Sequence, residues 1–175
     1  MELFDGQDPN TVTLEVAKQW LRDRYEAGAH CPLCHQFAKL YKRKLNAAMA
    51  YVLVLIYRWH KTKPEGHLEW LHVPSHIAKE GAGNARRAAA VRGDWAKLKH
   101  WGLIQEQPGR RSDESKRMGY YRITDRGIAF VNGQITVQSH IWIYNETMLD
   151  LPVFEKVSIR DTLGLKFNYA DLMGR

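Results

Sequence analysis

Apolar residues at three- and four-residue steps predict two helices in the first 60 residues, because this spacing places side chains on one face of a helix. The first helix lies in VTLEVAKQWLRDRYEAG and is expected to end at Gly28. The second pattern predicts a long helix from about Gln36 to about His60, which Pro64 and Gly66 then break. Its apolar positions are Phe37, Leu40, Leu45, Ala48, Val52, Leu55, Ile56 and Trp59.

Shorter patterns occupy the middle of the chain. LEWLHV predicts a short strand, and PSHIAKE predicts a short helix led by Pro74. ARRAAAVRGDWAKLKHW predicts one helix over 85–101, with small residues and cations opposite an apolar face that consists of Ala88, Val91, Trp95 and Leu98. Gly93 followed by Asp94 also fits a turn and an N-cap, which would give two shorter helices.

Charged and turn-forming residues between two apolar runs predict a hairpin. LIQEQ and GYYRIT are its expected strands, and PGRRSDESKRM is its basic, protruding tip. Thr124 is placed to cap the short helix DRGIAFV, and QITVQSHIWIY alternates like a half-buried strand. Ser158 and Asp161 have the spacing of a capping box at a last short helix.

The predicted fold class is α+β, mostly α, in three segments. These are an N-terminal helix and Cys-x-x-Cys turn over 1–35, a domain with the long helix over 36–132, and a C-terminal strand and short helix over 133–175. With 175 residues, 45% of them hydrophobic, the chain can bury a core. No apolar run approaches the roughly 20 residues that span a bilayer, and the acidic start lacks an apolar signal. We therefore expect a cytoplasmic protein with no membrane partner.

The net charge of +7 is concentrated in one quarter of the sequence. Residues 84–126 hold 11 Lys and Arg against 5 Asp and Glu, so this stretch supplies most of the excess. A localised basic stretch is typical of a nucleic-acid-binding surface. The alternative is an ordinary solvated surface that is rich in arginine.

The order of helix, short strand, helix, turn, helix, WGLI, basic hairpin and YYRITDRG resembles that of MarR-type and phage-encoded winged-helix DNA-binding proteins. The residues that carry the resemblance are Gly102, Leu103, Ile104, the wing from Pro108 to Gly119, Thr124 and Gly127. The resemblance covers roughly residues 45–132. It implies a winged helix-turn-helix domain with an extra N-terminal helical segment and a short C-terminal extension.

This resemblance implies a sequence-specific double-stranded DNA-binding protein, a repressor-like transcriptional regulator. Its recognition helix would enter the major groove, and its wing would reach phosphates or a minor groove. The implied DNA-binding residues are Arg86, Arg87, Arg92, Lys97 and Lys99 on or beside that helix, and Arg110, Arg111, Lys116 and Arg117 on the wing. The alternative is a protein-interaction module on the same frame, which binds and inhibits another protein such as a nuclease complex. The long helix either forms a homodimer or folds over its own domain.

Cys31 and Cys34 in HCPLCH have the spacing at which two thiolates bind one tetrahedral zinc ion. A structural zinc site needs two more ligands. The candidates are His72 with His76, His67 with His72, or a ligand from a second subunit. Reduced structural cysteines and a redox pair are the alternatives, and two cysteines exclude a disulfide framework.

Enzymatic activity is not expected. His60, His100 and His140 show no Ser or carboxylate partner in a triad-like context. The stretch EGAGN resembles a phosphate-binding loop, but it lacks the Gly-Lys-Ser/Thr ending that such a loop needs.

Overall fold

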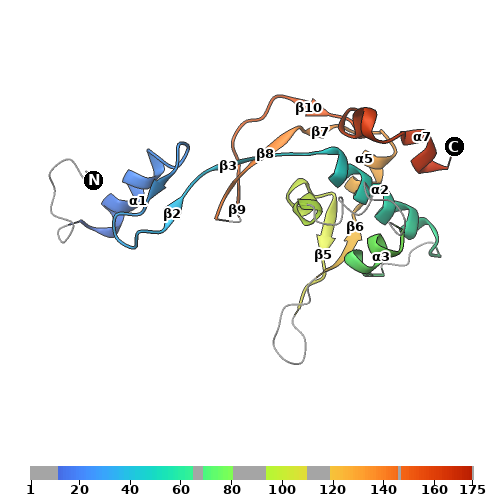
Figure 1. The fold of residues 1–175 in the computed structure, drawn as a ribbon, viewed down its shortest axis with the longest axis horizontal. Coiled ribbons are helices and arrows are strands. Elements are labelled where there is room, and N and C mark those ends of the chain that lie inside the picture. The colour runs from blue at the N-terminus through green and yellow to red at the C-terminus, as the bar shows by residue number, and fades with distance from the viewer. Residues whose placement is uncertain (1–11, 65–68, 81–93, 110–118, 146, 175) are drawn as a thin grey trace. The chain divides into compact units, whose positions relative to one another are not determined.

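The computed structural model describes residues 12–64, 69–80, 94–109, 119–145 and 147–174, and its chain forms two compact units (Figure 1). Unit 1 combines Met1–Arg43 with His140–Pro152, and unit 2 combines Lys44–Ser139 with Val153–Arg175. The segment expected over 133–175 is thus divided between the two units. In the described part of the chain, no helix has both the length and the apolar character that crossing a membrane requires.

Unit 1 contains one helix and two small sheets. The Thr13 hydroxyl accepts a hydrogen bond from the N–H of Val16 and so caps the first helix. The first sheet is an antiparallel hairpin, and the second has the strand order β3-β8-β9. The elements are α1 (Leu14–Arg22), β1 (Ala29–His30), β2 (Phe37–Ala38), β3 (Tyr41–Lys44), β8 (His140–Tyr144) and β9 (Thr147–Leu149).

The long helix predicted from about Gln36 to about His60 is wrong in its N-terminal part, up to Asn46. Residues 37–38 and 41–44 are strands, and α2 (Ala47–Lys61) begins only after Asn46. The Asn46 side chain accepts a hydrogen bond from the N–H of Met49 at 3.1 Å, which caps the helix there. Strand β3 pairs with β8, almost 100 residues away in the sequence. Such distant pairing overrides a local helical pattern.

Helix α2 forms the centre of unit 2. Every residue from Met49 to Tyr57 is buried. A helix that is apolar all round is expected in the interior of a domain, and α2 contacts other elements of unit 2, from the sheet to the C-terminal helices. Of the two alternatives for this helix, folding over its own domain is therefore the one observed. Homodimer formation stays a prediction, and it would have to use another surface.

A three-stranded antiparallel sheet and several short helices surround α2. The sheet has the order β4-β6-β5, so the strand before α3 pairs with the second strand of the hairpin. The expected hairpin strands are confirmed as β5 and β6. The elements up to this point are β4 (Leu71–His72), α3 (Val73–Glu80), the 3₁₀ helix η2 (Asp94–Trp101), β5 (Ile104–Glu106) and β6 (Tyr120–Ile123).

Two helices in the C-terminal half of unit 2 have the caps that the sequence predicts. Thr124 caps α5, and the predicted capping box of Ser158 and Asp161 is confirmed at α6. Hydrogen bonds from Ser158 to its carboxylate hold the pKa of Asp161 below its usual value. The elements are α5 (Asp125–Val131), β7 (Val137–Gln138), β10 (Lys156–Val157), α6 (Ile159–Leu163), η3 (Gly164–Lys166) and α7 (Tyr169–Met173).

The single strand predicted in QITVQSHIWIY is wrong, because the chain changes partners at Ser139. Strand β7 pairs with β10 on one side of this residue, and β8 belongs to another sheet on the other side. The Ser139 N–H and hydroxyl donate to the backbone oxygen and the carboxylate of Glu155, at 2.9 and 2.8 Å. Its carbonyl accepts from the N–H of Leu45 at 2.9 Å. These bonds hold Ser139 between the two pairings.

Candidate functional site

The strands β5 and β6 form a braced base for the basic stretch 110–118. Ile104 pairs with Ile123, and both side chains are buried. On the outer face, Arg122 donates two hydrogen bonds to the Gln105 side chain, at 2.9 and 2.7 Å. The N–H of Gln107 donates to the carbonyl of Tyr120 at 2.9 Å, which extends the pairing by one step. The chain therefore leaves and re-enters this base at adjacent points.

The residues of WGLI and ITDRG, which carry the resemblance, are joined by hydrogen bonds. The Thr124 hydroxyl donates to the carbonyl of Gly102 at 2.6 Å and accepts from the N–H of Gly127 at 3.0 Å. The N–H of Thr124 donates to the carbonyl of Leu103 at 3.2 Å. Arg126 Nε donates to the carbonyl of Trp101 at 3.0 Å. These bonds fix α5 against the start of β5 and so hold the hairpin.

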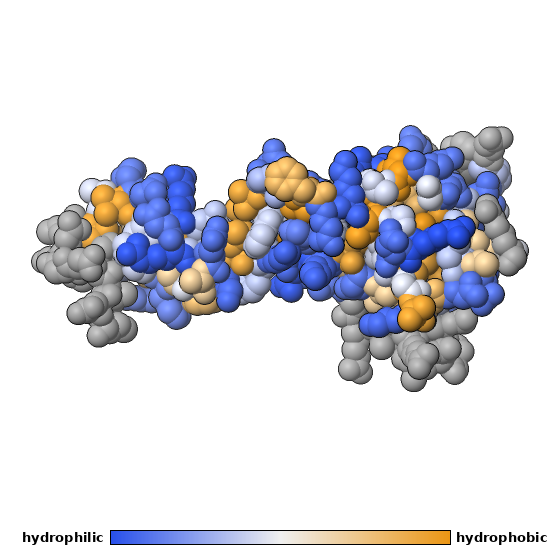
Figure 2. All heavy atoms as spheres, turned by 90° about the horizontal axis from the view of Figure 1, so that it is seen from above, coloured by the Kyte–Doolittle hydropathy of each residue, from blue (hydrophilic) through white to orange (hydrophobic). Residues whose placement is uncertain are grey.

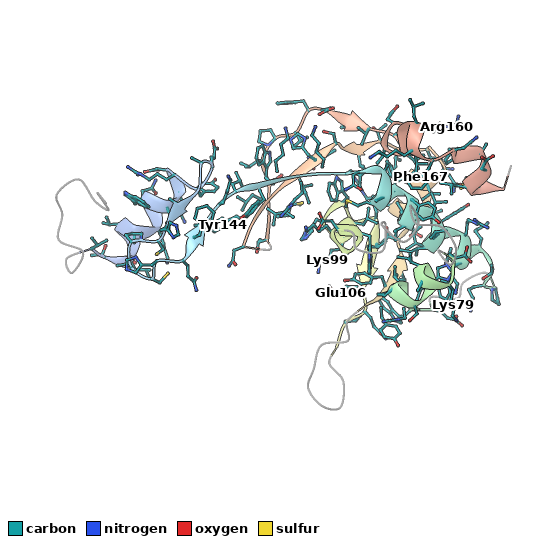
Figure 3. The ribbon with its side chains drawn as sticks, viewed as in Figure 1. Lys79, Lys99, Glu106, Tyr144, Arg160 and Phe167 are labelled. Carbon is teal, nitrogen blue, oxygen red and sulfur yellow. The ribbon has the colours of Figure 1, made fainter. Side chains whose placement is uncertain are left out.

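Lys99 connects the 3₁₀ helix η2 to the same hairpin. Its ammonium lies 2.7 Å from the carboxylate of Glu106 on β5 (Figure 3). The Tyr121 hydroxyl is hydrogen-bonded to the same carboxylate, and burial together with this negative charge raises the pKa of Tyr121 to about 12. The Tyr121 ring packs edge-on against Trp95, with the ring centroids 5.0 Å apart. The hairpin base is thus held by both apolar and charged contacts.

Only two of the nine predicted DNA-binding residues lie among the described residues. Lys97 pairs with Asp94 and Lys99 with Glu106, and all four side chains are partly exposed. An exposed ion pair contributes at most about 1 kcal/mol to stability, so phosphate oxygens can replace these carboxylates. The other seven lie outside the described residues: Arg86, Arg87, Arg92, Arg110, Arg111, Lys116 and Arg117.

The helix predicted over 85–101 is described only from Asp94 to Trp101, where it is a 3₁₀ helix. Trp95 and Leu98 are buried, as the expected apolar face requires. Residues 85–93 lie outside the described residues, so the choice between one helix and two stays open.

Arg122 is a cation at the hairpin that the sequence reasoning left out of its residue set. Its guanidinium lies 4.7 Å from the centre of the Trp70 ring, in addition to its bonds with Gln105. The signal was the alternation in YYRIT, because Arg122 stands between the buried residues Tyr121 and Ile123 and must point to the opposite face.

The two cysteines lie in the turn of the β1–β2 hairpin. The N–H of Cys31 donates to the carbonyl of Gln36 and the N–H of His35 to the carbonyl of Cys31, both at 2.8 Å. His35 has a φ of 58°, a conformation unusual for a residue other than glycine. Burial raises the pKa of Cys31, but hydrogen bonds from the N–H groups of Cys34 and Leu33 and from the Cys34 side chain outweigh it, so this pKa is lowered.

The predicted metal ligands His72 and His76 each have other contacts within unit 2. His72 Nδ1 is hydrogen-bonded to the Ser75 hydroxyl at 2.6 Å, and its ring packs against Tyr120. His76 is half-buried beside α2. No group of three or more His, Cys, Asp or Glu able to hold a metal ion occurs among the residues that the structure describes. Cys31 and Cys34 belong to unit 1 and His72 and His76 to unit 2, so this ligand set stays a prediction, and His67 lies outside the described residues.

The protonation of His76 should make folding stability depend on pH. Burial lowers the pKa of His76, outweighing the Glu80 carboxylate and a Leu55 backbone hydrogen bond, which raise it. In the unfolded chain His76 takes up a proton with a pKa of about 6.5, and in the folded chain it does so only at a lower pH. His76 should therefore leave the free energy of unfolding unchanged above about pH 6.5. Below that pH, the free energy of unfolding should fall as the pH drops.

Denaturant unfolding at about pH 7.5 and about pH 5.5 measures this change. The variant His76→Gln, whose side chain does not titrate, should lose less stability between the two conditions than the wild-type protein. An equal loss in the two proteins would contradict the assignment to His76.

Comparison of the chain with protein-family models, with curated protein sequences and with solved structures gives no match.

Proposed function

We propose that this chain is a sequence-specific double-stranded DNA-binding protein, a repressor-like regulator built on a winged-helix frame. A helix from about Ala85 enters the major groove, and the stretch from Pro108 to Gly119 contacts the flanking backbone. The protein acts by binding, without turnover. Occupancy of a promoter then excludes the polymerase.

The strand order of the sheet in unit 2 supports the winged-helix frame. A short strand before α3 pairs with β6, and β6 pairs with β5. The elements occur in the order helix, strand, helix, 3₁₀ helix and two strands, apart from the segments outside the described residues. This order agrees with the one that the resemblance implies. The hydrogen bonds between WGLI and ITDRG explain what the motif residues do in the fold, because they hold α5 against β5.

The observation that carries the proposal is the hairpin of β5 and β6, whose two strands are joined by a basic stretch of the sequence. The stretch from Pro108 to Gly119 holds four Lys and Arg against two Asp and Glu, and it joins two strands held by paired backbone, buried isoleucines and an ion pair. The held strands fix the two points at which this stretch leaves and rejoins the sheet. Phosphate contacts position the protein, and base contacts from the helix read the sequence.

Binding to a pool of mixed-sequence duplexes tests the proposal. We expect fluorescence anisotropy to report tight binding at low salt, and sequencing of the bound fraction to show one enriched motif. Single-stranded DNA of the same composition serves as the control, since major-groove reading needs a duplex. Weak binding without an enriched motif would contradict the proposal and favour the protein-interaction module.

A further inference from the structure

The β1–β2 hairpin brings two thiols together at one end of unit 1. Cys31 is half-buried and Cys34 is exposed, and both line a hollow of about 280 Å³. Two thiolates at Cys-x-x-Cys spacing in a tight turn can bind one tetrahedral metal ion.

Two thiolates provide only half of a zinc site. Structural zinc is almost always held by four ligands in a tetrahedron. Within the described ranges of the chain, no third His, Cys, Asp or Glu joins the pair to form a metal-binding group. Histidines stand directly on both sides of the pair in the sequence, at His30 and His35. His30 donates from Nδ1 to the carbonyl of His35 and packs its ring on Phe37.

Exposed apolar side chains surround this half-site. Leu33 is 42% exposed, Phe37 53% and Tyr41 42%, and Phe37 and Tyr41 line the same hollow as the cysteines. Of the eight large hydrophobic residues that are exposed in the described ranges, six belong to unit 1, and hydrophobic surface is visible there (Figure 2). Such a patch beside incomplete metal ligation favours a protein partner that covers both.

We propose that Cys31 and Cys34 are half of a zinc site, which a second copy of the chain completes with the same two cysteines. The four thiols release their protons on binding Zn²⁺, so the site carries a net charge of −2. Lys39 lines the same hollow and supplies positive charge nearby. The contact between the two copies also covers Leu33, Phe37 and Tyr41. This proposal does not rest on DNA binding.

Zinc content and molar mass of the full chain, purified under reducing conditions, test the proposal. We expect one zinc per two chains, and a mass by light scattering of twice the 20.3 kDa of one chain. Chelation should halve this mass, and added Zn²⁺ should restore it. The variants Cys31→Ser and Cys34→Ser should each lose the zinc and run as monomers.

Two control variants separate this ligand set from the alternatives. His35→Gly should keep both zinc and dimer, because glycine adopts a φ of 58° without strain. His72→Ala should also keep both, since its ring is not a ligand of the proposed site. One zinc per chain in a monomer would overturn the role of the second copy. A zinc-free protein, with free thiols or a Cys31–Cys34 disulfide, or a dimer that persists without zinc, would overturn the site.

Discussion

Replacing Gly127 with alanine should destabilise the folded chain by about 3 kcal/mol. A Cβ at this position would lie 2.1 Å from the carbonyl oxygen of Leu103 and 2.8 Å from a side-chain carbon of Ile123. The first of these is a backbone atom, which cannot move aside as a side chain can. Displacing the Leu103 oxygen would also break the hydrogen bond that it accepts from the N–H of Thr124.

Helix propensity alone predicts the opposite sign for this substitution. Gly127 lies in α5, and alanine in a helix is favoured over glycine by about 1 kcal/mol. Denaturant unfolding therefore decides between local propensity and close packing. Gly133→Ala is the control, because Gly133 has a φ of 73° but no atom within 4 Å of its would-be Cβ. This variant should lose only about 1 kcal/mol of stability, because alanine is strained in that backbone conformation. A Gly127→Ala variant as stable as the wild-type protein would contradict the packing described here.

The double variant Arg110→Glu and Arg111→Glu should lower both duplex affinity and its salt dependence. If about six cations neutralise phosphates, the slope of log K against log salt is about −5. Affinity then falls by about 10³ between about 50 and about 200 mM salt. Without two of these contacts the slope should be about −3.6, and the fall over the same range about 10².

Anisotropy titrations of one duplex at several salt concentrations measure these slopes. The matched control is Lys156→Glu with Lys166→Glu, which makes the same change in net charge at two exposed lysines elsewhere in unit 2. The control should bind more weakly through the overall charge but keep the slope of the wild-type protein. An unchanged slope in the arginine variant would remove residues 110–111 from the contact surface.

Local chemistry explains which expectations held. The Thr124 cap and the capping box of Ser158 with Asp161 depend on residues within a few positions of one another, and the hairpin strands are two apolar runs joined by one turn-forming stretch. The contact between WGLI and ITDRG, and the need for glycine at position 127 beside Leu103, became visible only in the structure. The expected DNA contacts of the wing and the zinc ligands concern groups whose partners lie outside the chain, and they stay predictions.

The amino-acid sequence by itself determined the helix caps, the hairpin and the concentration of positive charge in residues 84–126, because each of these follows from the residue types along one continuous stretch. The tertiary structure alone decided where α2 begins, that β3 pairs with β8, and that the chain changes sheets at Ser139. Strand pairing depends on hydrogen bonds between segments far apart in the sequence. A short apolar run fits a helix or a strand equally well until its partner is present.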